Sequence, residues 1–140
     1  MQRSGSVRWK VGEHLRGVAG DFSDLVAWQE SAALARDVVS AARQVRGVAA
    51  GEAASQLARA AESVPANVAE AYGRGLSGDG ARFLRVARAS AVELESHLRV
   101  AAMSSRLPVG RVDQLVTRTR RVRALIHGLL RYAEARRPRR

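Results

Sequence analysis

The side chains that could hold a metal or perform catalysis are few, and their spacing suits neither task. Glu93 and His97 stand four positions apart, whereas a di-metal site in a helical bundle uses Glu-x-x-His pairs on two helices. The glycines of residues 73–80, GRGLSGDG, lack the spacing and the Lys-Ser or Lys-Thr ending of a phosphate-binding P-loop. No serine, histidine and aspartate form a recognisable triad. We therefore expect no catalytic residue, no metal, no cofactor and no enzyme activity.

Arginine is the residue type with a chemical role to play, because its guanidinium group binds phosphate. The net charge is +11, and residues 111–140 contain ten arginines against Asp113 and Glu134. This excess predicts an acidic partner, most often nucleic acid bound through its backbone. The alternatives are a solvated helix face, or docking on the tail, residues 136–140, or on the N-terminal Arg3, Arg8, Lys10 and Arg16. The predicted phosphate-binding residues are Arg118, Arg120, Arg121, Arg123, Arg131, Arg136 and Arg137.

Polar residues also surround a proline in the stretch AESVPANVAEAYGR, residues 61–74. Ser63, Asn67 and Glu70 recur at helical spacing and so share one helix face. A proline inside a helix removes one backbone hydrogen bond, and a nearby serine hydroxyl can bond the backbone instead. This face is either a buried polar seam that fixes helix register or a solvated surface. The residues of the predicted polar seam are Ser63, Pro65, Asn67, Glu70, Ser90 and Glu93.

Helices must position all of these side chains, because apolar residues recur every three or four positions and no useful strand-like alternation is present. We predict helices over residues 23–46, 52–72, 78–104 and 108–135, which make one domain over 22–135. A basic arm, 1–21, precedes this domain, and a basic tail, 136–140, follows it. Ser23 and Ser77 are the predicted N-caps of the first and third helices, and Pro108 is placed in the first turn of the fourth.

Apolar stripes predict the core positions of three helices. In the first helix the stripe is Leu25, Trp28, Ala32, Ala35, Val39 and Ala42. In the third helix the stripe is Phe83, Ala87, Ser90, Leu94, His97 or Leu98, and Ala101. In the fourth helix it is Val112, Leu115, Thr119, Val122, Ile126, Leu129 and Ala133. Amphipathic helices joined by short loops can bury such stripes only against one another. The predicted fold is therefore all-α, an antiparallel up-down four-helix bundle with a proline-kinked second helix.

Composition limits the class of protein further. The chain has 140 residues and no cysteine, which excludes disulfides, thiolate metal sites and a cysteine nucleophile. No apolar run approaches the ~20 residues that cross a membrane. These features suit a cytoplasmic protein that does not enter a membrane.

Three motifs resemble a known family. They are F-x-D-L-x-x-W-Q at 22–29, Q-L-x-R-A-A-x-S-x-P-A-N-x-A-E at 56–70 and R-F-L-x-x-A-x-x-S-x-x-E-L-E at 82–95. In this order and spacing they resemble the four-helix bundle proteins known as 23S rRNA intervening-sequence proteins, over about residues 22–133. Ala71 departs from the family's usual glycine. Residues 77–81 lack the family's glutamate and aromatic residue, which leaves Ser77 without its capping-box partner.

The resemblance implies a small basic bundle without enzyme activity that assembles into a homopentameric ring. Members of this family are also similar to the accessory variability protein of diversity-generating retroelements. That similarity implies nucleic acid and a reverse transcriptase as partners. The hypothesis that we favour is a non-catalytic, homo-oligomeric protein that binds RNA or DNA. The alternatives are a protein-interaction adaptor and a membrane-surface protein. The lack of Trp and Phe in the last helix argues against the membrane alternative.

Overall fold

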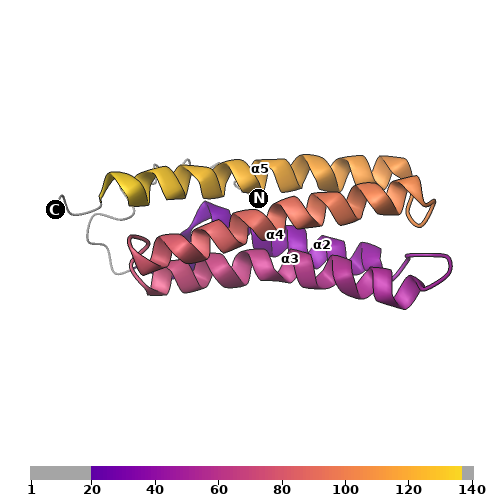
Figure 1. Cartoon of the computed structure of the whole chain (residues 1–140), viewed down its shortest axis with the longest axis horizontal. Helices are drawn as coiled ribbons and strands as arrows, with labels where there is room; N and C mark the ends of the chain where they lie inside the picture. Colours follow the sequence, from indigo (N-terminus) through magenta and orange to yellow (C-terminus); the bar gives the residue numbers. More distant parts are fainter. Residues whose placement is uncertain (1–19, 137–140) are drawn as a thin grey trace, which may run out of the picture.

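The computed structural model describes residues 20–136, which form four long α-helices after one short 3-10 turn (Figure 1). The elements are η1 (Phe22–Asp24), α2 (Val26–Ala42), α3 (Ala50–Gly73), α4 (Asp79–Met103) and α5 (Val109–Ala135). No strand occurs among the described residues, so the predicted all-α class is confirmed as a helical bundle. The predicted arm up to residue 19 and the tail after Arg136 lie outside the described residues.

Each helix packs against its neighbours in the chain, and α2 also contacts α5 (Figure 1). The loops 43–49 and 104–108 lie at one end of the bundle, where the Arg46 N–H donates to the Arg106 carbonyl at 3.1 Å. The loop 74–78 lies at the other end. No helix in the range 20–136 is both long enough and apolar enough to cross a bilayer.

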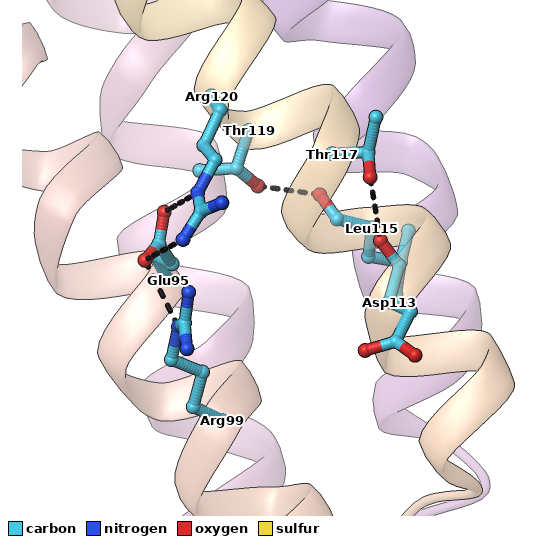
Figure 2. Close-up of polar contacts among 7 residues, drawn as sticks. All are labelled: Glu95, Arg99, Asp113, Leu115, Thr117, Thr119 and Arg120. Atoms are coloured by element: carbon cyan, nitrogen blue, oxygen red, sulfur yellow. Dashed lines mark hydrogen bonds and ion pairs between the residues drawn. The ribbon is translucent and has the colours of Figure 1, made fainter.

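The core-facing side of α5 is the one that the sequence predicted. All seven predicted positions, from Val112 to Ala133, are buried. Thr119 is the polar member of this stripe, and its hydroxyl donates to the Leu115 carbonyl at 2.7 Å (Figure 2). This bond satisfies the buried hydroxyl within its own helix, so a polar residue fits the apolar face.

The core-facing side of α2 is rotated relative to the predicted stripe. Trp28, Ala32 and Val39 are only half-buried. The buried residues of α2 are Ala27, Ser31, Leu34, Ala35, Val38, Ala41 and Ala42. Alanine occurs on several faces of this helix, so the apolar pattern discriminates poorly between them. Burial of Ser31 leaves no unsatisfied hydroxyl, because this hydroxyl donates to the Trp28 carbonyl at 3.1 Å.

The helix boundaries correct the predicted caps. Ser23 lies inside η1, and a capping box between Asp21 and Asp24 starts that turn instead. Gly78 precedes α4 without a side-chain cap, so Ser77 is not its N-cap. Pro108 is the N-cap residue of α5 and not a residue of its first turn. The predicted first helix, 23–46, ends earlier, at Ala42, and the Arg46 N–H in the following loop donates to the Arg106 carbonyl.

Helix α3 runs without a break through Pro65 and packs closely against the start of α4. Its end is a Schellman motif, with Gly75 at φ 83° and the Leu76 N–H bonded to the Ala71 carbonyl at 2.9 Å. A Cβ atom added to Gly80 would lie 2.8 Å from that same carbonyl oxygen. Glycine at position 80 therefore permits the close approach of the two helices.

Candidate nucleic-acid interface

Two of the predicted phosphate-binding arginines are paired with acidic residues of α2. Arg118 Nη1 lies 2.6 Å from Asp37 Oδ2. Arg121 binds Glu30 through two nitrogens, at 2.6 and 2.8 Å. The hydrogen bond from Arg118 holds the pKa of Asp37 below its ordinary value, and the pKa of Arg121 is raised by its bond to Glu30. Asp37 also accepts from Arg36 Nε at 3.3 Å, so these contacts offset only part of the positive charge on the side of α5 that faces α2.

On the opposite side of α5, one carboxylate serves two arginines (Figure 2). Glu95 of α4 accepts from Arg120 Nε at 2.9 Å and from Arg99 Nε at 2.9 Å. The Glu95 side chain is only 16% exposed. The hydrogen bond from Arg120, with a smaller contribution from Arg99, lowers the pKa of Glu95. Two guanidinium groups therefore share one negative charge at this point.

The helix faces on this side form a surface that we call the α4–α5 seam. It extends from the Arg85–Glu134 contact at 3.5 Å to the cluster in which Glu95 binds both Arg120 and Arg99. Residues spaced three or four apart between these contacts share the same faces. The arginines of the seam are Arg85, Arg88, Arg99, Arg120, Arg123 and Arg131, and its acidic residues are Glu95 and Glu134. Positive charge therefore exceeds negative charge along the seam.

Three arginines of the seam have no acidic partner in the described part of the chain. They are Arg88, Arg123 and Arg131, none of which forms an ion pair there. Arg131 is exposed, and Arg88 and Arg123 are half-buried. Unpaired guanidinium groups in a row can bind successive phosphates.

The predicted phosphate-binding residues thus separate into groups. Arg120, Arg123 and Arg131 lie in the α4–α5 seam, whereas Arg118 and Arg121 are paired on the α2 side. The Arg136 guanidinium stacks over the Tyr132 ring, 3.9 Å from its centroid. The predicted Arg137 lies outside the described residues.

The predicted polar seam is brought together only in part. Ser63 and Ser90 hydroxyl oxygens lie 2.8 Å apart across α3 and α4. Asn67 donates its amide to the Ser63 carbonyl at 2.7 Å and to the Ser63 hydroxyl at 3.0 Å. The Ser63 hydroxyl bonds these side chains, whereas the prediction had it bond the backbone beside Pro65. A small hydrogen-bond network therefore links α3 to α4.

The two acidic residues predicted for the polar seam lie elsewhere. Glu70 accepts from Arg74 Nε at 2.9 Å on the exposed surface of α3. Glu93 lies 3.3 Å from His97 within α4 and does not reach α3. Each residue contacts a side chain four positions further along its own chain segment, so neither joins the network between α3 and α4. Within residues 20–136, no three histidine, aspartate or glutamate side chains gather as a metal site.

Sequence reasoning missed the contribution of α4 to the basic surface. Half of the arginines of the seam belong to α4: Arg85, Arg88 and Arg99. The predicted phosphate-binding residues included none of them. Their spacing of three and eleven residues places them on one helix face and was readable from the sequence. The partner of each arginine was not readable, because Glu95 and Arg120 are 25 residues apart in the chain.

Comparison with known proteins gives one match to a family and none to an individual curated protein. The family model described as 23S rRNA-intervening sequence protein matches residues 23–128. No curated protein matches the chain. The matched range begins in η1 and continues into α5, so it includes all the residues of the polar network and most of the α4–α5 seam. The chain belongs to the 23S rRNA-intervening sequence protein family.

Proposed function

We propose that this protein binds nucleic acid, RNA or DNA, through the phosphate backbone and performs no catalysis. The observation that carries the proposal is the unequal charge of the two sides of α5. On the α2 side, Arg118 and Arg121 are matched by Asp37 and Glu30, and Arg111 is left without an acidic partner among the described residues. On the α4–α5 seam, three arginines lack a described acidic partner: Arg88, Arg123 and Arg131. Unmatched positive charge attracts a polyanion, and its release of counterions on binding supplies affinity.

The family name supports the same partner, since it refers to 23S rRNA intervening sequences. We propose a cytoplasmic protein that is an accessory to a reverse transcriptase or is associated with rRNA intervening sequences. We further propose an antiparallel up-down bundle, bent at Pro65, that assembles into a ring of five copies. The pairing of Arg85 with Glu134 and of Glu95 with Arg120 supports opposite directions for α4 and α5. In a ring the seam would repeat, so one strand could contact several copies.

Fluorescence anisotropy on labelled RNA and DNA, from low to moderate salt, tests the binding proposal. Changing Arg123 and Arg131 together to Gln should weaken binding to all sequences. The slope of log K against log salt should flatten by roughly 0.7 per lost contact to a single strand and 0.9 to a duplex. The matched control is Arg36→Gln with Arg59→Gln, which removes two charges from α2 and α3 outside the seam. Equal losses in both variants would contradict docking at the seam.

The ring is tested separately, by light scattering after size-exclusion chromatography at micromolar concentration. The proposal predicts a mass near five times 15.1 kDa. A single mass of one protomer would contradict the ring while leaving the binding measurements valid.

A further inference from the structure

The bundle end formed by the loops 43–49 and 104–108 carries a surface that the proposed function does not use. Two hydrogen bonds join these loops: the Arg46 N–H donates to the Arg106 carbonyl at 3.1 Å, and Arg106 Nη1 donates to the Arg46 carbonyl at 3.2 Å. The loops are thereby held in a fixed relation to each other. An open cavity of about 740 Å³ lies against them.

The cavity is basic. Arg43, Arg46 and Arg106 line it, and no acidic residue does. None of the three forms an ion pair with a residue in the range 20–136, and the Arg106 guanidinium bonds only a backbone carbonyl there. Unlike the α4–α5 seam, which contains Glu95 and Glu134, this cavity has no carboxylate in its wall. Three uncompensated guanidinium groups favour an anionic ligand.

The same end exposes large apolar side chains. Val109 lines the cavity and is 61% exposed. Val48, in the first loop, is 89% exposed, and Met103, the last residue of α4, is 84% exposed. These are the three most exposed large apolar residues of the described chain. One exposed apolar residue needs no explanation, but several at one place are typical of a surface that binds a protein.

One residue of the cavity wall is held in an unfavourable backbone conformation. Ser105 has φ 54°, the left-handed region in which a residue with a Cβ atom costs about 1–2 kcal/mol relative to glycine. The equivalent position after α3 is Gly75, which accepts this conformation without strain. Strain of this kind gathers at binding sites. Serine at position 105 therefore adds a hydroxyl to the cavity wall, although glycine would adopt this backbone conformation with less strain.

We propose that this end docks a short segment of a partner protein that combines carboxylates with large aliphatic side chains. Arg43 and Arg46 bind the carboxylates, since guanidinium groups pair with carboxylates in bidentate geometry. Val109 and its apolar neighbours cover the aliphatic side chains. Nucleic acid fits less well, because no aromatic residue lines the cavity to stack a base, and phosphates leave valine and methionine uncovered.

The experiment measures anisotropy of a fluorescein-labelled twelve-residue peptide that alternates Asp or Glu with Leu. Two control peptides separate the contributions: one replaces Leu with Ser, and the other replaces the acidic residues with Asn and Gln. The protein variants are Arg43→Gln with Arg46→Gln, and Val109→Ser. The charge-matched control is again Arg36→Gln with Arg59→Gln. A labelled single-stranded RNA is titrated in parallel against every variant.

The proposal predicts saturable binding of the alternating peptide below about 100 µM. Binding should fall at least tenfold for the double arginine variant and at least threefold for Val109→Ser, with less than twofold change for the control. Both control peptides should bind at least fivefold more weakly than the alternating peptide. RNA binding should stay within twofold of wild type in these variants, which separates this site from the α4–α5 seam.

Three results would overturn the proposal. The first is an alternating peptide that does not saturate, or that binds equally to every variant. The second is a loss of RNA binding, and not of peptide binding, when Arg43 and Arg46 are changed, which would assign the end to nucleic acid. The third is a smaller assembly for Val109→Ser by light scattering, which would assign the end to a second copy of the chain.

Discussion

Neutralising Glu95 should weaken the fold and strengthen nucleic-acid binding at the same time. In Glu95→Gln, Arg99 and Arg120 lose their shared charge partner. Exposed ion pairs contribute about 0.2–1 kcal/mol each, and this carboxylate is mostly covered and serves two arginines. We therefore expect a loss of about 1 kcal/mol in the free energy of unfolding, or a fall of about 3–4 °C in Tm.

The gain in binding follows from the charge that is removed. A carboxylate roughly 5 Å from a bound phosphate repels it by about 0.8 kcal/mol in water, which corresponds to about fourfold in affinity. The freed Arg99 and Arg120 can each contact a further phosphate, which would steepen the salt slope for single strands by up to about 1.4. Anisotropy with labelled RNA at low salt, and thermal melts by circular dichroism, measure the two effects.

Glu30→Gln is the matched control, because it makes the same change in net charge and frees Arg121 on the α2 side. We expect less than a twofold gain in RNA affinity from this control. An equal gain in both variants would mean that net charge alone decides binding. Weaker RNA binding by a folded Glu95→Gln protein would mean that Glu95 orients Arg120 for the ligand. Either outcome would refute the reasoning that assigns binding to unpaired charge on the seam.

The remaining predictions concern stability. The pKa values of Glu95 and Asp37 are lowered in the folded chain, so the unfolded chain binds more protons near their ordinary pKa values of 4.5 and 3.8. The stabilisation from these carboxylates is therefore complete above about pH 5 and is lost as the pH falls below 4. Urea midpoints measured across this pH range check the expectation. Asn67→Leu removes the amide that donates to the Ser63 carbonyl and hydroxyl, while the hydroxyl keeps its bond with Ser90, and should cost about 0.5–1.5 kcal/mol, against no change in Tm or mass for a solvated face. Gly80→Ala places a new methyl group against the Ala71 carbonyl and should lower the free energy of unfolding by about 1–3 kcal/mol, measured by urea denaturation. An unchanged urea midpoint would mean that α3 and α4 can move apart slightly without loss of stability.

Sequence reasoning succeeded where apolar residues stand out from their neighbours. In α5, polar and charged residues separate Val112, Leu115 and Ile126, so one buried face is unambiguous. In α2, alanines on several faces remove that contrast, and the buried Leu34 and Val38 were missed. Local spacing predicts which residues share a helix face but does not predict what the neighbouring helix presents to them.

For the candidate interface, the sequence predicted which helix is basic but not which of its arginines are paired. Arginine content identified α5 as basic, and Arg123 and Arg131 remain in the candidate seam. The separation of paired from unpaired arginines depends on packing between helices. Arg118 and Arg121 look equivalent to Arg123 in the sequence, and only the position of α2 beside α5 distinguishes them.

The ion pairs between α2 and α5 also affect the rate at which the folded protein unfolds. Arg118 and Arg121 reach residues 81 and 91 positions earlier in the chain, so these contacts join the first long helix to the last. Contacts between distant segments require costly loop closure and tend to form after local helix pairs. Interactions that form after the transition state slow unfolding and leave the folding rate nearly unchanged. We therefore expect these arginines, which contribute least to the proposed binding surface, to slow unfolding, and we expect salt to reduce this effect by screening them.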